Sequence, residues 1–160
     1  MKNKVDLPIA FALMLFAAFI LPILDAGAQD AKSVVGTYAA VSNPSYGDTP
    51  RGQLILGQDG HYSLVVLRRT LPKVAGGTRE KGTTEENKAI VIGSIAHYGR
   101  YTVDTKEKTI TFNVEGSTFP NWDGETFKRD LKLSGDQLIY TNKAPSGGGG
   151  AIEVVWKRVK

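Results

Sequence analysis

Short β-like runs, most of them followed by a turn signal, fill this chain from residue 34 onward. The fifth run shows the pattern best, because Ile110, Phe112 and Val114 alternate with polar residues, which is the period of a strand with one buried face. Eight runs are predicted as strands, at residues 34–42, 52–57, 61–69, 98–104, 108–115, 125–133, 137–142 and 151–159. Most neighbours are joined by short turns such as Asp59-Gly60, and short turns impose antiparallel pairing.

This succession of hairpins predicts an all-β fold, an eight-stranded antiparallel up-and-down barrel. Closure of the barrel removes the exposed edges that an open sheet would leave. One inserted α-helix is expected, because Thr83 can cap a helix that begins with Glu85 and Glu86 and runs to about Ala96. A two-sheet sandwich is the alternative, but consecutive short hairpins favour the meander.

The first 28 residues have the pattern of an export signal. Lys2 and Lys4 precede an almost wholly apolar stretch at residues 7–24, and Ala26-Gly27-Ala28 offers small residues at a cleavage site before Gln29. We therefore expect a signal peptide at residues 1–28 and one domain at residues 29–160, exported to the periplasm or outside a bacterial cell. The alternative is that residues 7–24 are retained as a membrane anchor. After cleavage, no stable membrane insertion is expected.

Composition excludes several classes of protein. The chain has no cysteine and two histidines, which removes disulfides, thiolate metal sites and cysteine nucleophiles, so neither a metal nor a cofactor is expected. The formal net charge is +4, with the basic residues scattered singly or in pairs. Nucleic-acid binding is therefore not expected. The sequence leaves the oligomeric state open.

Arg129 is the most informative single residue. In the sixth run it shares a face with Phe127 and Leu131, whereas Lys128 and Asp130 lie on the opposite face. Arg129 is therefore predicted to point inward, where its permanent charge needs a partner. One interpretation is an anchor for a ligand carboxylate or phosphate. The other is half of a buried structural pair, or a rim residue that reaches water.

Further candidate ligand-binding residues accompany Arg129. His97 and Tyr101 share a face of the fourth run and could hydrogen-bond a ligand, although His97 could instead cap the end of the helix. Phe119, Asn121 and Trp122 lie in one loop, where they could line the barrel mouth or plug it. No residue is assigned a catalytic or metal-binding role. Trp156 is expected in the core.

Several segments resemble a family of bacterial lipocalin-like domains across about residues 33–159. The resemblance rests on Asp-Gly-His-Tyr-Ser at residues 59–63, Gly-Thr-Thr-Glu-Glu at residues 82–86, Glu-Gly-Ser-Thr-Phe-Pro-Asn-Trp at residues 115–122 and Val-Val-Trp-Lys-Arg at residues 154–158. It implies a calycin-type barrel with one inserted helix. The broader relatives include carriers of apolar small molecules and a few cyclases and isomerases. Tyr38 stands where the general lipocalin signature has tryptophan.

These observations favour an exported, non-enzymatic barrel that binds a small, hydrophobic or amphipathic and possibly anionic molecule in its lumen. That hypothesis requires an internal cavity above about 300 Å³. The alternative is a cofactor-free isomerase, cyclase or hydrolase at the barrel mouth, with His97, Glu115 and Tyr101 as acid–base groups and Arg129 holding a substrate anion. It requires His97 and Glu115 to line one open pocket. A third possibility is a structural envelope protein with a filled barrel.

Overall fold

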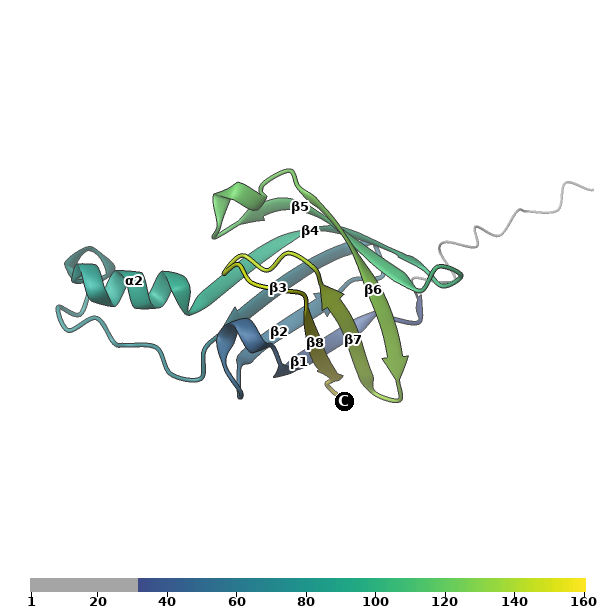
Figure 1. Cartoon of the computed structure of the whole chain (residues 1–160), viewed down its shortest axis with the longest axis horizontal. Coiled ribbons are helices and arrows are strands. Elements are labelled where there is room, and N and C mark those ends of the chain that lie inside the picture. The colour runs from purple at the N-terminus through teal and green to yellow at the C-terminus, as the bar shows by residue number, and fades with distance from the viewer. Residues whose placement is uncertain (1–31) are drawn as a thin grey trace, which may run out of the picture.

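The computed structural model of this chain describes residues 32–160. The predicted signal peptide at residues 1–28 lies outside the described residues. Eight antiparallel strands form one closed barrel, in which each strand pairs with the next and β1 pairs with β8 (Figure 1). The strands are β1 (Gly36–Ser42), β2 (Arg51–Leu56), β3 (His61–Leu67), β4 (Ser94–Asp104), β5 (Thr109–Ser117), β6 (Thr126–Ser134), β7 (Gln137–Asn142) and β8 (Ile152–Arg158). The predicted fold is confirmed, and the sandwich is wrong because the sheet closes.

The inserted helix is shorter than the sequence predicts. Helix α2 (Thr84–Ile92) begins with the expected capping box between Thr83 and Glu86, but it stops at Gly93 rather than near Ala96. The chain then enters β4 at Ser94, four residues before the predicted start. The reason is that β3 offers unpaired backbone groups, and residues 94–96 pair with them instead of continuing the helix. The other strand ends lie within two residues of prediction.

The barrel interior is filled by side chains from every strand. Alternation along each strand sends one set inward, as in β3, where Tyr62, Leu64 and Val66 are buried between exposed neighbours. Burial of each such side chain contributes about 1.5–3 kcal/mol. The most completely buried side chains are those of Val34, Tyr38, Leu54, Leu56, Val66, Ile110, Phe112, Leu138, Val154 and Trp156. Trp156 is thus a core residue, as predicted.

The first and last strands are joined by side chains as well as by backbone. Tyr38 lies opposite Arg158 in the β1–β8 register, and the guanidinium carbon of Arg158 lies 4.8 Å from the centre of the Tyr38 ring. The same guanidinium donates hydrogen bonds to the carbonyl oxygens of Val35 and, at 3.0 Å, Ser33. Arg158 therefore fixes the segment that precedes β1 to the last strand.

Replacing Arg158 with Met should lower the free energy of unfolding by about 1–2 kcal/mol, because the hydrogen bonds and the ring contact are lost together. Urea denaturation of the two proteins measures this difference. Lys157→Met on the neighbouring, outward-facing position is the matched control, and we expect it to change stability by less than about 0.5 kcal/mol. Equal losses in the two variants would contradict a closing role for Arg158.

Short elements gather at one end of the barrel. Figure 1 shows helix α2, the short helices η1 (Pro44–Tyr46) and η3 (Pro120–Trp122), and the β7–β8 connection at residues 143–151 at the same end. The tight turns between β4 and β5 and between β6 and β7 lie elsewhere. The η1–η3 end is therefore where irregular backbone and side chains can form a site.

No helix within residues 32–160 is long and apolar enough to cross a bilayer.

Candidate functional site

Arg129 points into the barrel, as its place in the sequence predicts. It pairs with Ile110 across β5 and β6, and only 4% of its surface is exposed. Its guanidinium carbon lies 4.7 Å from the ring centre of Tyr140, 5.4 Å from that of Phe112 and 5.5 Å from that of Phe127. Aromatic rings thus surround the charge, and cation–π attraction offsets part of its desolvation.

Within residues 32–160, no acidic side chain pairs with this buried charge. Among residues 32–160, Arg129 forms neither an ion pair nor a hydrogen bond, and its Nε is buried without a partner. A buried polar group without a partner costs about 1–3 kcal/mol, and more when it is charged. The interpretation of Arg129 as half of a structural ion pair is therefore not supported by the described part of the chain. The guanidinium is instead available to a group from outside.

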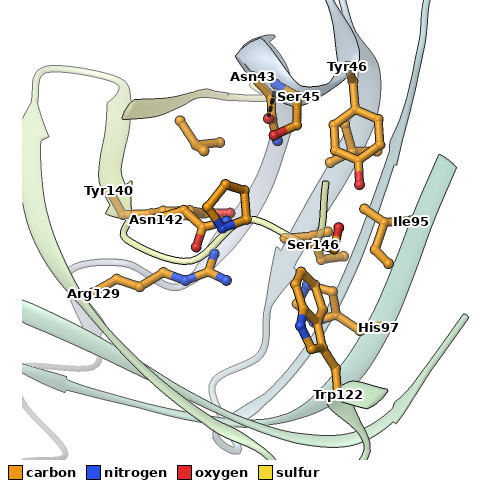
Figure 2. A pocket seen from close by; sticks show the side chains of 14 residues that line it. Asn43, Ser45, Tyr46, Ile95, His97, Trp122, Arg129, Tyr140, Asn142 and Ser146 are labelled. Atoms are coloured by element: carbon orange, nitrogen blue, oxygen red, sulfur yellow. Dashed lines mark hydrogen bonds between the residues drawn. The ribbon is translucent and has the colours of Figure 1, made fainter. Parts of the chain in front are cut away.

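His97 lies across the lumen from Arg129 (Figure 2). Its Nδ1 is 2.8 Å from the hydroxyl of Tyr62, and its ring packs edge-on against Trp122 with the ring centres 5.6 Å apart. Burial lowers the pKa of His97 to about 3, and the charge of Arg129 acts in the same direction. The imidazole is therefore neutral at physiological pH. Because α2 ends at Ile92, His97 does not cap the helix.

A small inner cavity lies between these groups (Figure 2). It holds about 20 Å³, which is room for about one water molecule. Its walls are formed by Asn43, Ser45, Tyr46, Leu64, Val66, Ile95, His97, Trp122, Arg129, Tyr140, Asn142, Pro145, Ser146 and Val154. The volume of this inner cavity is far below the value of about 300 Å³ that the hypothesis of luminal binding requires. A ligand that reaches Arg129 must displace part of the wall.

A larger outer cavity adjoins the inner one at the η1–η3 end. Its volume is about 340 Å³, and it is lined by Ser45, Tyr46, Arg68, Val91, Ile92, Ser94, Ile95, Thr118, Phe119, Ser146, Gly147 and Gly148. The two cavities share Ser45, Tyr46, Ile95 and Ser146. A single layer of side chains therefore separates Arg129 from a space of ligand size.

The structure places four of the six predicted site residues on the walls of these two cavities. Arg129, His97 and Trp122 border the inner cavity, and Phe119 borders the outer cavity with its ring edge-on to Trp122. Tyr101 borders neither cavity, because its hydroxyl donates a hydrogen bond to the carbonyl of Gly57, and burial raises its pKa to about 12. Asn121 is exposed and also borders neither.

Sequence reasoning missed six polar or aromatic residues of the inner wall, namely Asn43, Ser45, Tyr46, Tyr140, Asn142 and Ser146. The alternation of β7 could have indicated two of them, since Tyr140 and Asn142 share the buried face of Leu138. Tyr46 and Ser146 lie in connections between strands, where no periodicity shows which way a side chain points.

The acid–base pair of the catalytic alternative is not assembled. His97 and Glu115 both border a groove of about 500 Å³, but the His97 ring lies on the lumen side, bonded to Tyr62. Glu115 is on the outer face, where its carboxylate lies 3.6 Å from Nε of Arg100. The two side chains thus point to opposite faces of the sheet.

In residues 32–160, no group of three or more acidic or histidine side chains could hold a metal ion.

Residues 32–160 form a closed eight-stranded barrel with a polar, ring-walled cavity near one end, which is the architecture of barrels that hold one small ligand. Comparison with known proteins gives the family. The model of the lipocalin-like domain matches residues 34–159, and the chain belongs to that family.

One curated relative is a protein of Aspergillus oryzae (strain ATCC 42149 / RIB 40) described as a 4'-hydroxy-3'-methoxypropiophenone carrier protein. It is 30% identical over 89 residues, which cover 52% of this chain and 80% of the relative.

Proposed function

We propose that this protein is an exported, non-enzymatic carrier that binds a small, largely apolar molecule at the η1–η3 end of its barrel. The observation that carries the proposal is Arg129, a buried charge with no counter-ion in residues 32–160. A buried charge without a partner lowers the stability of the protein. A ligand with an oxygen acceptor would supply the hydrogen bond that this guanidinium lacks in the ligand-free protein. The proposed export follows from the sequence of residues 1–28.

The relative from Aspergillus oryzae supports a carrier role. The compound in its name is an aromatic ketone with hydroxyl and methoxy groups, so it combines an apolar ring with oxygen acceptors. The inner wall of this chain offers partners for both parts of such a compound, because the guanidinium of Arg129 can donate to an oxygen and the aromatic rings beside it can contact an apolar ring.

Binding requires the wall of the inner cavity to move. The segment that carries Ser146 continues into four glycines at residues 147–150, and nothing lies within 4 Å of the position where a side chain of any of them would begin. Gly148 and Gly149 have φ angles of +76° and +91°, a conformation that other residues rarely adopt. We therefore expect residues 146–150 to be the part of the inner-cavity wall that moves when a ligand binds.

Titration of the purified full-length protein with 4'-hydroxy-3'-methoxypropiophenone tests the proposal. We expect saturable heat of binding in the micromolar range, as suits a ligand of this size, together with a change in tryptophan fluorescence. Trp122→Phe should lose most of the fluorescence change yet still bind, because Trp122 borders the cavity whereas Trp156 is buried in the core. Absence of saturable binding for this compound, for 4-phenylbutanoate and for 4-phenylbutanamide would overturn the carrier role.

A further inference from the structure

Resting on the proposed carrier function, we infer that the ligand is an acid with an apolar tail. Its anionic group occupies the inner cavity against Arg129, and its tail lies in the outer cavity between α2 and η3. The two parts connect through the wall that contains Tyr46 and Ser146. The inference joins two independent observations, the uncompensated guanidinium and the adjoining pair of cavities.

The charge of the inner cavity selects an anion over a neutral group. A guanidinium group in a protein is positively charged, and the other described residues around the cavity bring no charge to oppose that of Arg129. His97 is neutral there, and the remaining polar neighbours are the side chains of Asn43, Asn142, Tyr46 and Tyr140 and the hydroxyls of Ser45 and Ser146. A carboxylate would therefore meet one uncompensated positive charge and several neutral hydrogen-bonding groups.

The sizes of the two cavities divide the ligand into a head and a tail. The inner cavity, at about 20 Å³, accepts little more than the oxygens of one carboxylate. The outer cavity, at about 340 Å³, lies within the range of sites for small molecules. Val91, Ile92 and Phe119 form an apolar part of the outer wall, beside Arg68 and several hydroxyl side chains. Val91 and Ile92 are otherwise exposed on α2. A buried tail there would remove their surface from water.

The partition between the cavities is one side chain thick. Tyr46 points from η1 toward Ser146 and Ile95 (Figure 2), and burial raises the pKa of its hydroxyl, with the Ser146 side chain acting in the opposite direction. Both residues border both cavities. Displacement of Ser146 with its glycine-rich segment would join the two spaces without any change in the barrel.

A matched pair of probes tests the acid requirement in the unmodified protein. We expect 4-phenylbutanoate to bind at least tenfold more tightly than 4-phenylbutanamide at pH 7 by isothermal titration calorimetry, because the two share their tail and differ only in the head group, a carboxylate or a neutral amide. In Arg129→Met this preference should disappear while the amide keeps its affinity. Arg129→Lys retains a positive charge and should keep part of the preference. Equal affinities in the unmodified protein, or a preference that survives in Arg129→Met, would overturn the inference.

A second pair of variants tests the place of the tail. Ile92→Glu puts a carboxylate into the outer cavity and should weaken binding of both probes at least tenfold. Leu133→Glu is the control, since Leu133 is an exposed leucine that borders a separate cavity of about 490 Å³ with Val103 and Lys108. It should leave both affinities unchanged. Loss of binding in Leu133→Glu alone would place the ligand in that separate cavity and refute the inference.

The outcomes separate this inference from the carrier function. If the acid and the amide bind equally, the carrier role stands and the acid requirement is wrong. If neither of these probes binds and the aromatic ketone also gives no heat, both proposals fall. Thermal unfolding of each variant shows whether an altered affinity reflects a folded protein.

Discussion

Between pH 6.5 and about pH 3, this protein should lose about 4–5 kcal/mol of its free energy of unfolding through His97 alone. Burial lowers the pKa of His97 from 6.5 in the unfolded chain to about 3 in the folded protein. In that window the unfolded state therefore binds a proton that the folded state does not, and each pH unit costs about 1.4 kcal/mol. The stability is fully present above pH 6.5 and is lost as the pH falls.

Urea denaturation at a series of pH values measures this loss. His97→Gln can keep a hydrogen bond to Tyr62 but cannot be protonated in this range, so the difference between the two proteins should shrink or reverse as the pH falls. His61→Gln is the control, because His61 is exposed on β3 and its replacement should leave the steep loss in place. A difference between wild type and His97→Gln that does not change with pH would contradict the prediction.

Without ligand, Arg129→Met should be at least as stable as the wild type and up to about 3 kcal/mol more stable. Methionine fills similar apolar space among Phe112, Phe127 and Tyr140, and it removes the buried Nε that has no partner. The lost cation–π contacts act in the opposite direction, at about 0.5–2 kcal/mol. Removing one half of a buried ion pair would instead cost about 3–5 kcal/mol.

Chemical denaturation of the two ligand-free proteins decides between these signs. Arg100→Met is the matched control, because Arg100 is exposed on the outer face of β4 and its Nε lies 3.6 Å from the carboxylate of the exposed Glu115. Its replacement should change stability by less than about 1 kcal/mol. A loss of 3 kcal/mol or more in Arg129→Met alone would show that Arg129 holds the barrel together, and its role as a ligand anchor would be abandoned.

The sequence by itself determined the barrel and the inward direction of Arg129. Both follow from local rules, because side chains alternate along a strand and short turns allow only antiparallel neighbours. Lys128 and Asp130 mark the solvent face, which leaves Arg129 no other side. The pairing of β1 with β8 follows equally, since closing a meander must bring its first and last strands together.

Only the tertiary structure decided where along the barrel each inward side chain lies. His97 and Tyr101 share one face of β4, but four residues of extended chain separate them by about 13 Å. Alternation determines which face of the sheet a side chain occupies, but not its position along the barrel axis. His97 lies at the η1–η3 end, whereas the hydroxyl of Tyr101 donates a hydrogen bond to the carbonyl of Gly57 in the turn between β2 and β3. The local sequence also does not show when two elements compete for the same residues. Residues 94–96 fit the pattern of the helix, but in the structure they pair with β3.

The state of the lumen was also decided by tertiary structure. Whether a barrel is hollow depends on how side chains from all eight strands and from the connections pack together, and Tyr46 and Ser146 come from connections whose direction no periodicity specifies. Alternation could place Arg129 inside. Only the packed structure shows that no described acid meets it there, because the positions of the acids around a closed barrel depend on the register of every strand.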